Sequence, residues 1–100
     1  MQISIDQRLA DELASLFRLL GDPTRIRILR TLSDTDEMCV HEIASAVETN
    51  ETKVSQALRL LRTAHVVSNR RDGRHIHYRL DDDHVRTLLT ITAEHLAHQS

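Results

Sequence analysis

The chain has 100 residues and a formal net charge of −2 at neutral pH, which is the size of one small domain. Glycine, proline and aromatic residues are scarce, which argues against disorder and leaves aliphatic side chains to form the core. No apolar run is long enough to span a membrane, and the N-terminus lacks the pattern of a signal peptide. The single cysteine cannot form an internal disulfide. These features predict one cytoplasmic domain over residues 1–100 with no membrane partner.

Positive charge gathers in one part of the sequence. Residues 51–80 contain seven lysines and arginines against two acidic residues, a local balance of +5, whereas the acids lie mainly outside this range. Such an asymmetry favours one DNA-facing surface on an otherwise acidic body.

Apolar spacing and local breakers predict four helices in the first two thirds of the chain. Apolar side chains recur every three or four residues, as at Leu9 and Leu13. Gly21 ends the first helix, and Asp22 caps the second with Pro23 at its first position. The predicted ranges are a helix over 6–20, a helix from 23, a polar loop over 33–38, a helix over about 40–47, a turn over 48–50 and a helix over about 51–64. Two short helices joined by a tight turn indicate a helix-turn-helix.

A hairpin is predicted after the fourth helix. Asp72 and Gly73 separate two extended runs, residues 66–71 and 74–80, and Asp-Gly favours a type I′ turn with positive φ at both central residues. Alternation places Ile76, Tyr78 and Leu80 inward and His75, His77 and Arg79 outward. A basic-tipped hairpin after a helix-turn-helix is a wing. The predicted fold is therefore mainly α with a β-hairpin wing, in the order ααααββα, a winged helix-turn-helix.

The last predicted helix, within residues 81–98, carries three of the seven histidines. At about 100° per residue, His84, His95 and His98 fall on one stripe. His84 and His95 are about 16 Å apart along the axis, so one helix cannot bring both to one ion. Two antiparallel copies can, which predicts a symmetric dimer with two metal sites across its interface. The alternative is an ordinary solvated face that begins with first-turn acids at residues 81–83.

Three stretches resemble the ArsR/SmtB family of winged-helix metal-sensing repressors. They are residues 20–29 (LGDPTRIRIL), 54–59 (VSQALR) and 71–74 (RDGR), and the likeness covers residues 9–98. The resemblance implies a homodimer through the first and last helices. It implies that metal-free protein binds operator DNA and dissociates when Zn(II) binds, with two zinc ions per dimer as the effector. The tail pattern Asp82-x-His84-x10-His95-x2-His98 resembles the family's zinc site on the C-terminal helix.

Four protein ligands suit a closed, non-catalytic zinc ion, so a zinc hydrolase is disfavoured and no enzyme activity is expected. Asp82 and His84 would come from one subunit, and His95 and His98 from the other. On an ideal helix Asp81 lies closer to the stripe, and Asp82 fits only if the helix begins near residue 83 with Asp82 still extended. A nickel- or cobalt-responsive repressor is the alternative. Residues 1–10 contain no His or Cys to extend the ligand set, which favours zinc.

The second helix of the motif is predicted to enter the major groove, while the wing suits contact with the DNA backbone or the minor groove. The predicted DNA-binding residues are Thr52, Lys53, Ser55, Gln56 and Arg59 on the helix and Arg70, Arg71 and Arg74 on the wing. In a further alternative, the chain is a structural DNA-binding module with idle tail histidines.

Two further roles follow from the resemblance. Cys39, His41 and Glu42 lie where family members have a second, thiolate-rich metal site, although Cys39 can equally be a small buried apolar residue. The backbone carbonyl of His65 is placed within reach of His95, whose second ring nitrogen can then link the zinc site to the DNA-reading helix.

Overall fold

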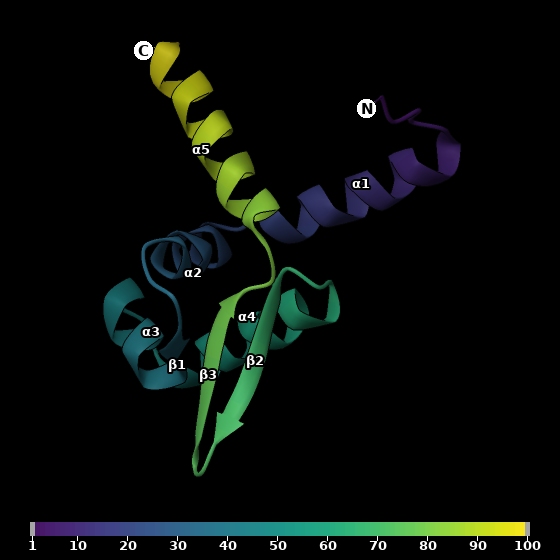
Figure 1. Ribbon diagram of the computed structural model, residues 1–100. Coiled ribbons are helices and arrows are strands. Elements are labelled where there is room, and N and C mark those ends of the chain that lie inside the picture. Colours follow the sequence, from purple (N-terminus) through teal and green to yellow (C-terminus); the bar gives the residue numbers. More distant parts are fainter. Residues whose placement is uncertain (1, 100) are drawn as a thin grey trace.

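A computed structural model describes residues 2–99, which form a winged helix-turn-helix (Figure 1). The elements are α1 (Gln7–Leu20), α2 (Pro23–Ser33), β1 (Met38–Cys39), α3 (Val40–Val47), α4 (Glu51–Thr63), β2 (Val67–Asp72), β3 (His75–Leu80) and α5 (Asp83–His98). The predicted helices are confirmed, with boundaries within a few residues. Within residues 2–99, no helix is both long enough and apolar enough to cross a membrane.

The core lies between α2, α3, α4 and the sheet. Its largest fully buried side chains are Ile28, Leu29 and Leu32 of α2, Ile43 of α3, Val54, Leu58 and Leu61 of α4, and Val67 of β2. These residues recur at helical spacing, so each helix buries one stripe and leaves the opposite side in water. The two helices of the helix-turn-helix, α3 and α4, are thereby held rigidly.

Short-range capping determines where the helices begin. The Asp22 carboxylate accepts a hydrogen bond from the Arg25 amide at 3.0 Å, which confirms the predicted cap ahead of Pro23. The Asn50 side chain accepts from the Lys53 amide at 2.8 Å and so starts α4. The turn between α3 and α4 begins with Glu48 in the left-handed region, φ +57°, where α3 ends.

The sheet corrects two predictions. It has three antiparallel strands in the order β1-β3-β2. Met38 pairs with Tyr78, so the last residue of the predicted loop over 33–38 belongs to a strand. Pairing of Asp72 with His75 leaves Gly73 and Arg74 as the turn. Among the described residues of the hairpin only Gly73 has positive φ, +63°, so the type I′ prediction is wrong. Gly at the first central position instead gives the φ pattern of a type II′ turn.

His77 is partly buried, whereas alternation alone predicted it to be outward. It does lie on the face opposite the core, but β1 is paired beside it, with Cys39 directly opposite. The predicted two-stranded hairpin lacks this third strand. The difference therefore comes from a tertiary pairing of segments far apart in the sequence.

Helices α1 and α5 extend from the core, and the hairpin tip points away from them (Figure 1). In α1 only Leu20 is buried, and α5 has no buried residue. Large apolar side chains remain exposed on both helices: Phe17 is 52% exposed and Ile91 is 59% exposed. Exposed apolar side chains on two helices that protrude from the core indicate an interaction surface.

Candidate DNA-binding and metal-binding sites

Helix α4 presents a polar face to solvent. The predicted DNA-reading residues of α4 are all exposed: Thr52, Lys53, Ser55, Gln56 and Arg59. Val54 and Leu58 between them are fully buried. Because the buried side anchors the helix in the core, the backbone positions of these polar residues are fixed while their side chains face solvent.

The wing arginines fall into two groups. Arg71 and Arg74 are exposed near the turn. Arg70 is also exposed, but it binds Glu37, with its Nε 3.0 Å from both carboxylate oxygens and a further contact from its terminal nitrogen. The Arg70 hydrogen bonds lower the pKa of Glu37. Arg70 is therefore held by Glu37 of the same chain.

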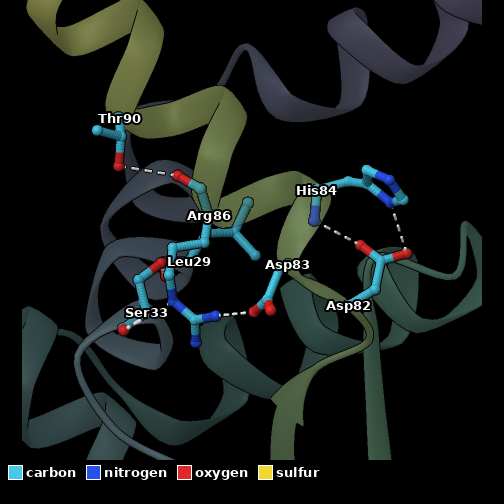
Figure 2. Close-up of polar contacts among 7 residues, drawn as sticks. All are labelled: Leu29, Ser33, Asp82, Asp83, His84, Arg86 and Thr90. Atoms are coloured by element: carbon cyan, nitrogen blue, oxygen red, sulfur yellow. Dashed lines mark hydrogen bonds and ion pairs between the residues drawn. The ribbon is translucent and has the colours of Figure 1, made fainter. Parts of the chain in front are cut away.

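At the start of α5, Asp82 and His84 lie side by side (Figure 2). Asp82 is the N-cap and is extended, with φ −153° and ψ −178°, and α5 begins at Asp83. Its Oδ1 accepts from the His84 amide at 2.9 Å, and its Oδ2 is 3.3 Å from His84 Nδ1. Hydrogen bonds from His84 lower the pKa of Asp82. The condition under which Asp82 could join the histidine stripe is thus met.

Neighbouring contacts fix this arrangement. Arg86 binds Asp83 and donates from Nε to the Ser33 carbonyl at 3.1 Å, which ties α5 to the end of α2. The Asp81 amide donates to the Val66 carbonyl at 3.0 Å and anchors the chain on the other side. Figure 2 shows Asp83 and Arg86 on one side of the helix start, and Asp82 and His84 on the other. The Asp83 carboxylate is engaged by Arg86, whereas Asp82 faces the exposed His84 ring.

The remaining two predicted ligands lie at the far end of α5. His95 and His98 are exposed in its last turns, and His95 is about 16 Å from His84 along the axis. Within residues 2–99 of the single chain, no three His, Cys, Asp or Glu side chains are grouped so as to hold a metal ion. One chain therefore brings Asp82 and His84 together and keeps His95 and His98 apart from them.

His65 lies near the Asp82 end of α5. It is in the turn between α4 and β2, in the left-handed region with φ +59°. A shallow hollow there is lined by Leu16, Leu20, Ala64, His65, Val66, Asp82, His84, Val85 and Leu88. The hollow thus joins the end of α4 to the predicted metal ligands of the same chain.

Cys39 is buried and serves as the N-cap of α3. Its thiol donates to Glu42 Oε1 at 3.0 Å, and the same oxygen accepts from the Cys39 amide at 3.0 Å. His41 Nδ1 is 3.0 Å from the sulfur. Burial raises the pKa of the Cys39 thiol, and the contact with Glu42 raises it further. These contacts make Cys39 the cap of α3 and place its sulfur beside His41 and Glu42.

These features define a class of protein. A rigid helix-turn-helix with an exposed polar second helix, followed by a basic hairpin, is a winged-helix DNA-binding regulator. The model of the family described as "Bacterial regulatory protein, arsR family" matches residues 22–69. The chain is 40% identical over 94 residues to the transcriptional repressor SmtB homolog of Synechocystis, covering 94% of this chain and 69% of that protein. The chain belongs to the arsR family, whose members are transcriptional regulators and not enzymes.

Other relatives and solved structures agree. The chain is 46% identical over 83 residues to the regulator KmtR of Mycobacterium tuberculosis, covering 80% of this chain and 63% of KmtR. The Rv0081 structure from M. tuberculosis has a TM-score of 0.84 at 34% identity and covers 93% of both chains. The homodimeric winged helix-turn-helix domain of Mb0332 from Mycobacterium bovis has a TM-score of 0.81 at 28% identity, covering 97% of this chain and 91% of that one. The chain thus spans about two thirds of the curated relatives' length and nearly all of the solved domains.

Proposed function

We propose that the protein is a homodimeric repressor that binds operator DNA when metal-free and dissociates from it on binding Zn(II) at two intersubunit sites. The observation that carries the proposal is the pair of donor atoms at the start of α5, Asp82 Oδ2 and His84 Nδ1, 3.3 Å apart. The protein would act in the cytoplasm, where bacterial operator DNA lies.

The donor atoms suit zinc. Two ligands at about 2.0–2.1 Å from a tetrahedral zinc ion stand roughly 3.3 Å from each other. Asp82 and His84 have this separation, and a carboxylate with an imidazole is an ordinary zinc donor set. We assign the other two ligands to His95 and His98 of an antiparallel partner helix, which gives two zinc ions per dimer. Zinc would then supply a bond between subunits that each chain alone lacks.

The exposed apolar residues of α1 and α5 support the dimer. Phe17 and Ile91 are both more than half exposed, although each lies on a helix beside the core. Burying them against a second copy would remove apolar surface from water. The similar domain of Mb0332 is described as homodimeric, which favours the same assembly here.

The choice of zinc rests on the ligands and not on the family. Related proteins are described as a cadmium resistance regulatory protein homolog, an arsenical resistance operon repressor and an antimony-specific repressor. These three relatives are named for three different elements, so the family by itself does not identify the effector. X-ray absorption of the zinc-loaded dimer should show nitrogen and oxygen ligands alone. A zinc–sulfur shell near about 2.3 Å would move the site to Cys39 and overturn the assignment.

The DNA face is assigned to α4 and the wing. Gln56 is exposed on the first half of α4, where a helix in the major groove contacts base edges. Replacing Gln56 by Ala should change sequence preference, whereas Arg74→Ala should weaken binding to all sequences and reduce its salt dependence.

Titration of the DNA complex with zinc, cobalt and nickel in turn tests the effector. Release of DNA by nickel or cobalt but not by zinc would identify a nickel- or cobalt-responsive repressor. Release by none of the three metals would indicate a DNA-binding module whose C-terminal histidines bind no effector.

Coupling between the two sites is assigned to His95 and His65. His65 shares a hollow with Asp82 and His84, so a partner's histidine arriving at that half-site would approach the end of α4. A metal-bound imidazole usually donates its second N–H to a nearby oxygen, here the His65 carbonyl. Zinc and DNA would then weaken each other's binding by the same factor, typically about 5- to 150-fold. Methylation of the distal nitrogen of His95 should keep zinc binding but reduce its effect on DNA affinity. Undiminished coupling would instead assign the signal to helix packing.

A further inference from the structure

The contact between Glu37 and Arg70 joins residues 33 positions apart. Both carboxylate oxygens of Glu37 accept from Arg70 Nε at 3.0 Å, and the Glu37 side chain is only 26% exposed. Arg70 is on β2, whereas Glu37 immediately precedes β1, so the contact spans the sheet across β3. A guanidinium that contacts both oxygens of one carboxylate is held in a defined direction.

Glu37 lies on a basic surface. Arg70 is opposite His77 in the strand pairing, and cross-strand partners place their side chains on one face of a sheet. Arg79 is two residues further along β3 and shares this face. Arg70, His77 and Arg79 all favour the ionised form of Glu37 and lower its pKa, the Arg70 hydrogen bonds most of all. Glu37 is therefore an anion held near Arg70 and Arg79 on the outer face of the wing.

Arg70 is close enough to the wing tip for its side chain to contact a DNA phosphate. It precedes Gly73 by three residues, or about 10 Å at roughly 3.3 Å per residue. A released arginine side chain there could reach a phosphate that Arg71 or Arg74 does not. In the structure its guanidinium is turned to Glu37 instead.

We propose that Glu37 determines DNA specificity by holding Arg70 away from the phosphate backbone. The inference rests on the proposed operator binding by α4 and the wing. Phosphate contacts add affinity for every sequence and so reduce the ratio of operator to non-specific binding. Because Glu37 forms an ion pair with Arg70, it limits this sequence-independent affinity. Recognition of the operator sequence then depends on α4.

The test compares salt dependence of binding for Glu37→Gln, Arg70→Gln, the double variant and Arg71→Gln, on operator and on random duplex DNA. Each added phosphate contact steepens the slope of log affinity against log salt by about 0.9, or about 1.8 for a dimer. Glu37→Gln should steepen the slope by that amount and raise non-specific affinity, which lowers the operator-to-random ratio. Arg70→Gln and the double variant should keep the parent slope, while Arg71→Gln should make it shallower.

The set of variants separates the possible failures. Glu37→Gln and Arg70→Gln break the same ion pair, so a general loss of wing structure would affect both alike. A steeper slope in the double variant would assign the effect to the lost negative charge and overturn the role of Arg70. A shallower slope in Arg70→Gln would show that Arg70 already contacts DNA in the parent and would overturn the inference. If neither the parent nor Arg71→Gln showed salt-dependent DNA binding, the proposed function itself would fail.

Discussion

Ile91 offers a direct test of the dimer. It lies midway between His84 and His98 along α5 and within about 20° of the His84 direction at about 100° per residue. Two antiparallel copies of this helix whose ends meet must cross near their middle. Ile91, 59% exposed in the single chain, should then pack against its own counterpart at the two-fold axis.

The size of the effect follows from the exposed fraction. Full burial of an isoleucine side chain is worth about 1.5–3 kcal/mol. Scaling by the 59% that is still exposed gives about 0.9–1.8 kcal/mol for each protomer, or about 2–3.5 kcal/mol for the dimer. At tenfold per 1.4 kcal/mol, Ile91→Ala should weaken dimerisation by roughly 30- to 300-fold.

Sedimentation equilibrium of the metal-free protein over a wide concentration range measures this dissociation constant. Leu60→Ala is the matched control, because Leu60 is an aliphatic residue, 49% exposed, that lies on α4 and not on α1 or α5. The control should dimerise like the parent. An Ile91→Ala variant with an unchanged dissociation constant, or equal weakening in both variants, would refute the antiparallel α5 interface and with it the intersubunit zinc sites.

Three further predictions concern stability at fixed protein concentration. Leu58→Ala should lower the free energy of unfolding by about 2–5 kcal/mol in denaturant titrations, because Leu58 is fully buried in the core. Asp22→Ala should lower it by about 1 kcal/mol through loss of the α2 cap, whereas Asp22→Asn should nearly preserve it. The pKa of Glu42 is lowered by its bonds from Cys39, so this contribution is complete above the unfolded-state pKa and is lost as pH falls through the folded-state pKa. Glu42→Gln should therefore flatten the acid limb of stability against pH, and an unchanged limb would contradict the role of this carboxylate.

Much of the fold was predictable because its signals are local. Asp22 and Pro23 start α2 through contacts within three residues, and the apolar period of α4 identifies which side is buried. The stripe of His84, His95 and His98 follows from helix geometry alone. Helix geometry also states what Asp82 requires to join this stripe, namely a helix that begins near residue 83.

Only the tertiary structure decided the rest. It placed the Asp82–His84 pair beside the end of α4, because Arg86 fastens the start of α5 to the Ser33 carbonyl of α2 and the Asp81 amide binds the Val66 carbonyl. It engaged Arg70 with Glu37, although the sequence makes Arg70 look like its neighbours on the wing. Hydrophobic period and capping act over a few residues and can be read from the order of side chains. Pairing across a sheet depends on which distant segments meet, and that is decided when the core closes.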